Sequence, residues 1–328
     1  MHIPDNYLSP STCLTIGAVM IPVWRRAVAI VKSELSRRKL PLLGICSAFS
    51  FLIMLFNVPI PGGTTGHAIG ATFIAILLGP HAAVISVTVA LVIQALFFGD
   101  GGILALGVNT FNMAFIMPFT GYYIFKLIKG NSESEKRGYI ASFIGAYVGM
   151  NMGVLLTAIE FGIQPILFKN AAGLPIYSPY PIQVSVPAML IPHILLIGIL
   201  EGIITSGAYM YIRKLSPEII YNSKFQKRKL SMKYMNILIL AMMVLSPLGI
   251  LASGSAWGEW SNEELLGLIG YIPEGMKDGF IYNALFADYG VKGLSQNAGY
   301  LISTVIGVGI IFIVINIISK ITISKHNN

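Results

Sequence analysis

The first residues of the chain, MHIPDNYL, place a histidine directly after the amino-terminal amine. Such an X-His terminus is a preformed chelator, because the Met1 amine, the deprotonated His2 amide nitrogen and His2 Nδ1 close two fused rings around one cation. These nitrogens are nearly coplanar and leave one corner of a square open. A tetragonal all-nitrogen site suits Ni(II) or Cu(II), whereas Zn(II) prefers a tetrahedron. A histidine at position 2 is no evidence of a site by itself, so a further ligand is required.

His67 is the candidate for the open corner. It ends the stretch PIPGGTTGH, in which Gly62, Gly63 and Gly66 allow close backbone approach and unusual dihedral angles. An apolar stretch at 68–79 follows directly. Whether His67 can meet His2 therefore depends on the elements that carry the two residues.

The composition indicates a polytopic membrane protein. Of the 328 residues 55% are hydrophobic and only 11% are charged, and the mean hydropathy is +0.74. Soluble domains usually carry about a quarter charged residues, so a soluble fold, a disordered chain and a disulfide scaffold are excluded. Cys13 and Cys46 lie in apolar runs and are expected to be buried as small hydrophobic residues. Apolar stretches that could form helices are found at 11–31, 40–57, 68–79, 82–97, 103–128, 138–158, 182–212, 235–252 and 297–319.

The basic residues predict the orientation of these helices. Apart from Lys169, Lys277 and Lys292, the 22 lysines and arginines lie in the C-terminal part of the first, fifth, seventh or ninth stretch or after it. The positive-inside rule then places the N-terminus outside and the C-terminus in the cytoplasm. The same loops account for the pI of about 9.4, so we expect no nucleic acid partner. The stretches at 68–79 and 82–97 form a tight hairpin at Gly79-Pro80, and the first of them is short enough to be a half-span.

This orientation selects among the histidines. His81 falls on a cytoplasmic turn and His326 in the cytoplasmic tail, while His193 lies mid-membrane and is expected to serve helix packing. His2 and His67 are the pair that faces outward. No positive segment precedes the first apolar run, so we expect no cleaved signal peptide. Because His2 is too large for removal of the initiator methionine, we expect the mature chain to keep Met1.

The chain divides at a charged segment. Residues 1–212 are predicted to form a seven-span domain, 213–234 a basic cytoplasmic linker, and 235–328 a two-span segment with an outer loop at 253–296. Gly145, Gly149 and Gly153 repeat at a spacing that permits close helix packing in lipid.

The sequence lacks two catalytic motifs. There is no GxxxxGK[ST] phosphate loop, so the chain does not hydrolyse ATP by that machinery, and there is no HExxH motif of a metalloprotease. His193 and Glu201 are the intramembrane ionisable residues, and such groups mark functional sites by default. We expect Glu201 to be a structural partner of a neighbouring helix. The sparse charges make a stand-alone channel or secondary carrier less favourable.

Five ordered motifs resemble one family. They are MHIPD-x-YLSP at the N-terminus, GGTTGH before the third stretch, QALFFGDGG at 94–102, ALGVNTFNM at 105–113 and PHILLIGILEGIIT at 192–205. Together they resemble the nickel/cobalt-capturing membrane subunit (NikM/CbiM type) of energy-coupling factor (ECF) transporters over about 1–212. The family usually has glycine where this chain has Asn6, and asparagine also tolerates a left-handed turn.

The resemblance implies a site. An N-terminal loop folds into the protein, and Met1, His2 and His67 bind the metal. Asp5, Gln94, Asn109 and Asn112 belong to the matching motifs, where they orient the ligands or, equally, serve helix packing and turn capping. The transported substrate is Ni(II), with Co(II) as the alternative, and no catalytic cofactor is implied.

The resemblance also implies an architecture and partners. The fold is an all-α integral membrane protein of the cell membrane, with a seven-helix capture domain. The two added transmembrane helices resemble the small accessory subunit (NikN-like), here fused. A transmembrane coupling subunit and cytoplasmic ATPase subunits would drive import. A membrane metalloenzyme that uses the same histidines is the alternative from another class, and it needs an open metal position beside a general base.

Overall fold

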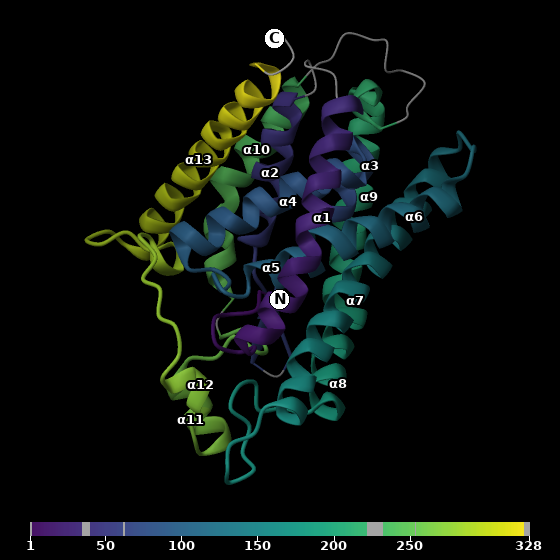
Figure 1. Cartoon of the computed structure of the whole chain (residues 1–328). Helices are drawn as coiled ribbons and strands as arrows, with labels where there is room; N and C mark the ends of the chain where they lie inside the picture. The colour runs from purple at the N-terminus through teal and green to yellow at the C-terminus, as the bar shows by residue number, and fades with distance from the viewer. Residues whose placement is uncertain (1, 35–39, 62, 222–231, 253, 325–328) are drawn as a thin grey trace.

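The computed structural model describes residues 2–34, 40–61, 63–221, 232–252 and 254–324, and these residues are mainly helical (Figure 1). The prediction of an all-α protein is confirmed. One short antiparallel pair, β1 (Val58–Ile60) and β2 (Thr64–Gly66), precedes His67. The helices are α1 (Pro10–Glu34), α2 (Leu40–Met54), α3 (Ala71–Leu78), α4 (Pro80–Ile93), α5 (Leu106–Thr110), α6 (Met117–Lys129), α7 (Glu135–Leu167), α8 (Ile182–Pro192), α9 (Gly198–Leu215), α10 (Lys233–Leu245), α11 (Asn262–Ile269), α12 (Glu274–Lys277) and α13 (Gln296–Ser324).

Each apolar stretch in the sequence contains a helix of the structure. Within the described residues, six helical segments are long and apolar enough to cross a membrane: Pro10–Glu34, Pro80–Phe98, Glu135–Leu167, Ile182–Leu215, Lys233–Leu251 and Gln296–Ile318. Two of these segments contain wide π-helical turns, at Gln94–Phe98 after α4 and at His193–Ile197 between α8 and α9. Another such turn, Phe111–Ile116, joins α5 to α6. The number of membrane crossings stays a prediction.

The helix α3 is short enough to be a half-span. Its eight residues extend for about 12 Å, too little to cross the hydrocarbon layer alone. It turns directly into α4 at Gly79, whose φ of 90° requires glycine, and Pro80 begins the next helix. This confirms the hairpin. Because α3 is short, the non-helical residues 67–70 carry the chain into the interior, and they bring His67 with them.

The repeated glycines of α7 serve packing, as predicted. A Cβ added at Gly145 would lie 2.5 Å from the carbonyl oxygen of Gly121 in α6, and one at Gly149 would lie 2.8 Å from that of Met117. At Gly153 the Cβ would meet the Met117 side chain at 2.6 Å. The two helices therefore touch through their backbones, which only glycine permits at these positions.

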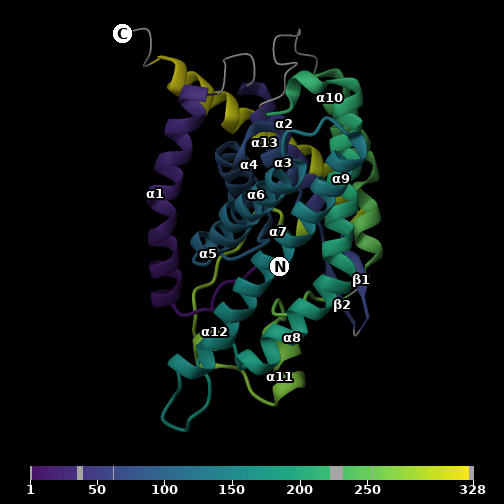
Figure 2. The ribbon, with the colours of Figure 1, turned by 90° about the vertical axis from the view of Figure 1, so that its right-hand side faces the viewer.

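The C-terminal helices α10 and α13 both pack against α2. Gly307 of α13 lies against the ring of Phe51, and a Cβ at Gly249, just after α10, would overlap the carbonyl of Leu55. The segment between the two helices, expected as a loop, contains α11 and α12. These short helices lie near the lower end of the molecule, as α8 does (Figures 1 and 2). The C-terminal segment therefore packs on α2 and also reaches the end of the molecule where α1 begins.

Replacing Gly145 with alanine should destabilise the protein by about 1–3 kcal/mol, the usual range for overpacking, because the new methyl group meets a carbonyl that cannot retreat without moving α6. Gly207→Ala is the matched control: it also lies within a helix, and a Cβ there meets nothing within 4 Å. Thermal unfolding of the purified protein in detergent measures both. Equal melting temperatures for the two variants would contradict the packing described here.

Candidate metal site

The segment before α1 enters the helical bundle, and side chains hold its main chain. In Figure 2 this segment (purple) runs from the lower end of α1 toward the middle of the molecule. The Asn109 amide forms two hydrogen bonds with Ile3: its Oδ1 accepts from the Ile3 N–H at 2.8 Å, and its Nδ2 donates to the Ile3 carbonyl at 3.0 Å. The Gly102 N–H donates to the same carbonyl. Ile3 is fully buried, so the position of its neighbour His2 is fixed.

The next residues continue this pattern. The Asp5 carboxylate accepts hydrogen bonds from the N–H groups of Ile103 and Leu104, at 3.0 and 2.7 Å. Asn6 has a φ of 69°, which confirms that asparagine takes the left-handed turn expected where the family has glycine. Its amide both donates to and accepts from the main chain of Phe280, in the C-terminal segment. The predicted folding of the N-terminal loop into the protein is therefore observed for the residues from His2 onward.

His2 and His67 lie side by side. Their ring centroids are 5.1 Å apart with 30° between the ring planes, and the residues are 3% and 7% exposed. Both line a polar cavity of about 420 Å³ together with Asp100, Tyr289 and Glu259. Since metal–nitrogen bonds measure about 2 Å, one cation between the rings could bind a nitrogen of each. The structure thus brings together two groups that are far apart in the chain.

His2 presents its two nitrogens differently. Its Nδ1 lies 3.0 Å from Asp100 Oδ1. A carboxylate only accepts hydrogen bonds, so Nδ1 donates and the lone pair of the neutral ring is on Nε2. Nε2 is buried and has no hydrogen-bond partner among the described residues. The sequence-based chelate uses Nδ1, which donates to Asp100, so chelation requires His2 to give up that hydrogen bond and to carry its ring proton on Nε2 instead.

His67 is prepared to act as a ligand. Its Nδ1 lies 3.1 Å from the carbonyl oxygen of Ala68, and a carbonyl can only accept, so Nδ1 carries the proton and Nε2 has the free lone pair. Burial lowers the pKa of the His67 ring well below its usual value, and repulsion from the His2 ring adds to this whenever that ring is protonated. The neutral form, which binds metals, therefore predominates at neutral pH.

Asp100 is the site residue that sequence reasoning missed. Its Oδ2 accepts from the Tyr289 hydroxyl at 2.5 Å and from Gln94 Nε2 at 3.0 Å. Burial by itself would raise the pKa of the Asp100 carboxyl, but the charge and hydrogen bond of His2 and the hydrogen bond of Tyr289 outweigh it and hold this pKa well below its usual range. The signal was present, because Asp100 is the acidic residue of the motif QALFFGDGG.

Four residues were predicted either to orient the metal ligands or to serve packing, and the structure places three of them near His2 or Asp100: Asp5, Asn109 and Gln94, but not Asn112. Asn109, which binds the main chain of Ile3, and Asp5, which accepts from the main chain of residues 103 and 104, both anchor the segment that follows His2, and Gln94 contacts Asp100. Asn112 instead donates hydrogen bonds to Thr157 and Glu160 of α7, at 3.0 and 2.6 Å. The contacts of Asn112 are therefore with a helix and not with the two histidines.

The remaining candidates can also be placed. His193 is buried, and its Nδ1 contacts the carbonyl of Met189 one turn earlier in its own helical segment. His81 stacks edge-on against Phe119 near the start of α4. Glu201 is bonded not to a side chain of another helix but to the main chain of residues 69 and 70. Met1 and His326 lie outside the described residues.

The side chains of the described residues do not supply a full set of metal ligands. Within the described residues, no three His, Cys, Asp or Glu side chains form a group that could hold a metal ion. A cation bound between His2 and His67 therefore needs donors beyond these side chains. The main-chain and terminal nitrogens proposed from the sequence are of that kind.

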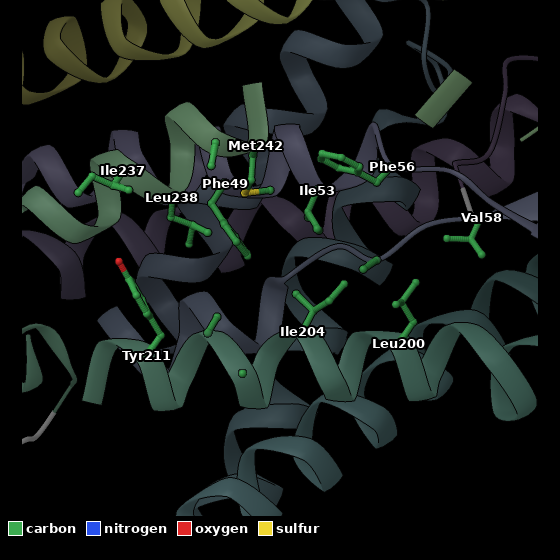
Figure 3. A pocket seen from close by; sticks show the side chains of 14 residues that line it. Phe49, Ile53, Phe56, Val58, Leu200, Ile204, Tyr211, Ile237, Leu238 and Met242 are labelled. Atoms are coloured by element: carbon green, nitrogen blue, oxygen red, sulfur yellow. The ribbon is translucent and has the colours of Figure 1, made fainter. Parts of the chain in front are cut away.

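A second, larger cavity offers no such chemistry. It has a volume of about 580 Å³ and lies between α9 and α10, with α2 behind (Figure 3). The figure shows apolar side chains turned toward it, among them Phe49, Ile204 and Met242. A cation there would lose its hydration and gain no ligands. The candidate site is therefore the polar cavity.

Known proteins are similar to this chain over nearly its whole length. The family described as "Cobalt uptake substrate-specific transmembrane region" (CbiM) matches residues 2–219, and the PDGLE domain matches 231–324. The chain is 46% identical to a probable fused nickel transport protein (LarMN) of Lactiplantibacillus plantarum over 96% of both chains. It is 41% identical to a fused nickel transport protein (NikMN) of Rhodobacter capsulatus over 95% of both.

A solved structure is also similar. The crystal structure of a truncated transition metal transporter matches with a TM-score of 0.62 and 53% identity, covering 65% of this chain and 99% of that one. Family match, full-length relatives and fold all point the same way. The chain belongs to the CbiM family of substrate-specific transmembrane proteins for cobalt uptake, with a C-terminal PDGLE domain in the same chain, and it is similar over nearly its whole length to fused nickel transport proteins.

Proposed function

We propose that this chain captures Ni(II) at the outer face of the cell membrane and presents it, as cargo, for ATP-driven import. The observation that carries the proposal is the pair of buried imidazoles, His2 and His67, whose ring centroids lie 5.1 Å apart in one polar cavity. The donors are the Met1 amine, the His2 amide nitrogen, His2 Nδ1 and His67 Nε2. Four nitrogens in a square suit Ni(II).

The surroundings of the pair support cation binding. The ionised Asp100 carboxylate lies beside His2 and offsets the charge of an incoming cation. When the metal takes His2 Nδ1, Asp100 loses that hydrogen bond but keeps those from Tyr289 and Gln94. The cost of freeing His2 is therefore limited, because the partly buried carboxylate keeps these two hydrogen bonds.

The partners follow from what the sequence lacks. It contains no phosphate loop, so ATP hydrolysis belongs to cytoplasmic ATPase subunits, linked to this chain by a transmembrane coupling subunit as in ECF transporters. The basic loops face the cytoplasm and the N-terminus faces outward. This orientation exposes the metal cavity to the side from which the ion arrives.

Cobalt is the alternative cargo, since relatives in Ruminiclostridium cellulolyticum and Geobacter sulfurreducens are cobalt transport proteins. Nitrogen donors also accept Co(II), but a planar square favours Ni(II). The d-d absorption spectrum of the loaded protein distinguishes the two geometries. The relatives are transport proteins, which disfavours the metalloenzyme.

Blocking the N-terminus should abolish stoichiometric nickel binding, because the α-amine exists at one place in the chain. N-terminal acetylation removes the amine with little added bulk, whereas one extra residue also adds a side chain. A C-terminal tag is the control. Bound nickel per protein, measured by elemental analysis, compares native, acetylated, extended and tagged forms. Full loading with a blocked terminus would falsify the amine ligand.

His2→Ala should weaken nickel binding more than His67→Ala. The first change removes a chelate ring and its preorganisation, whereas the second leaves the fused rings intact with water in the vacated corner. His81→Ala, a histidine outside the cavity, is the matched control and should bind as the native protein does. Isothermal titration with Ni(II) measures the affinity of each variant. A larger loss for His67→Ala, or any comparable loss for His81→Ala, contradicts the ligand set.

Nickel affinity should fall as pH falls, by about a hundredfold per pH unit below an amine pKa of about 7.7–8.0, because amine and amide each release a proton on binding. His67 contributes nothing to this slope near neutrality: burial lowers its pKa, so it is already neutral there. His67→Ala should therefore lower the affinity by a constant factor between pH 8 and 6.5. Titrations at several pH values test both points, and an affinity that is flat down to pH 5 would exclude the site.

A further inference from the structure

Glu201 is a buried carboxylate whose partners belong to the metal-site segment. It lies in α9 and is 1% exposed. Its Oε2 accepts from the Ile69 N–H at 2.8 Å, and its Oε1 accepts from the Gly70 N–H at 3.0 Å. These two N–H groups follow His67 closely in the chain. One side chain thus fastens the end of the segment that carries His67.

The segment needs this partner because its backbone is buried and not helical. Ala68 and Ile69 are 1% and 0% exposed, and a buried N–H without an acceptor is costly. Gly70 precedes α3 with a φ of 71° and has no side chain to cap the helix. A Cβ there would lie 2.4 Å from the ring of Phe49, so no capping residue fits. The cap must come from another element, and a carboxylate also suits the positive end of the helix.

A second contact holds the segment from its other side. The Ser50 hydroxyl of α2 donates to the Ile69 carbonyl at 3.0 Å. The main chain of Ile69 is therefore held between α2 and α9. Since His67 is two residues away and its ring is turned toward His2, a shift of this anchor moves His67 Nε2 relative to the other nitrogens.

We propose that Glu201 is a positioning residue of the metal site: it fixes the place at which His67 presents Nε2 to the cation. This inference rests on the proposed function, in which His67 is a ligand. Glu201 itself touches no metal. If Glu201 only stabilised the fold, replacing it would weaken nickel binding by the same factor with and without the His67 side chain.

The test is a double-mutant cycle on the full-length protein in detergent, with Ni(II) as the titrant. Glu201→Gln keeps the size of the side chain but turns an amide group toward one of the two N–H donors. It should raise the Kd for Ni(II) about tenfold, as loss of a ligand-orienting partner does, and should change the d-d spectrum. In a His67→Ala background the same change should have no further effect on the Kd.

Glu160→Gln is the matched control. Glu160 is also a buried carboxylate in a helix, 6% exposed, but it accepts from the Asn112 side chain and not from the segment of His67. Any effect of this variant on the Kd should add to that of His67→Ala. If Glu201→Gln proved equally additive, the positioning role would be overturned while the proposed function stood. If His67→Ala left the Kd unchanged, the ligand set itself would fail.

A second variant covers the case in which Glu201→Gln folds poorly, and hydrogen exchange adds a direct measurement on Glu201→Gln where it folds. Ser50→Ala loosens the same segment from α2 and removes only a hydroxyl, and its effect on the Kd should likewise vanish in the His67→Ala background. In metal-free protein, Glu201→Gln should accelerate hydrogen exchange at the Ile69 and Gly70 amides. Unchanged exchange there would show that Glu201 does not hold the segment and would overturn the inference.

Discussion

The structure depends on satisfying the polar backbone of two non-helical segments inside a helical bundle. Most of residues 2–9 and all of residues 67–70 are buried, and a buried N–H or C=O group without a hydrogen-bond partner is costly. Side chains therefore tie each segment to the surrounding elements. Asn109 binds the main chain of the first segment, and Asp5 of that segment accepts from the main chain of residues 103 and 104. Glu201 and Ser50 bind the main chain of the second segment. The two histidines meet because these partners hold their backbones in place.

The two halves of the site are held by different elements. His2 depends on α5 through Asn109, and the end of its segment depends on α7, where Gln164 accepts from the Ser9 N–H. His67 depends on α2 and α9. The separation of the two rings is thus set by how these groups of helices pack, and backbone contact between α6 and α7 is part of that packing. A site built on loops gains its precision from the helices around it.

The C-terminal segment takes part in the cavity and does not merely follow it in the chain. More than half of the residues that line the polar cavity belong to this segment. Tyr289 donates to Asp100, and the main chain of Phe280 pairs with Asn6. Tyr7 donates to the Trp260 carbonyl at 2.6 Å. The fused arrangement thus places hydrogen-bond partners for the N-terminal segment in the same polypeptide.

The sequence alone determined the helical class and the apolar stretches and singled out the pair His2 and His67, because hydropathy, charge and a histidine next to the terminal amine are properties of neighbouring residues. It also indicated that Asn6 would take a left-handed turn and that the glycines of α7 would serve packing. Only the tertiary structure decided which polar groups meet. Asp100 and Tyr289 are 189 residues apart, and Glu201 and Ile69 are 132 apart. Asn112, for which the sequence left ligand orientation and helix packing equally open, donates to Thr157 and Glu160 of α7. Hydrogen-bond partners of buried groups are set by long-range packing, which no local pattern encodes.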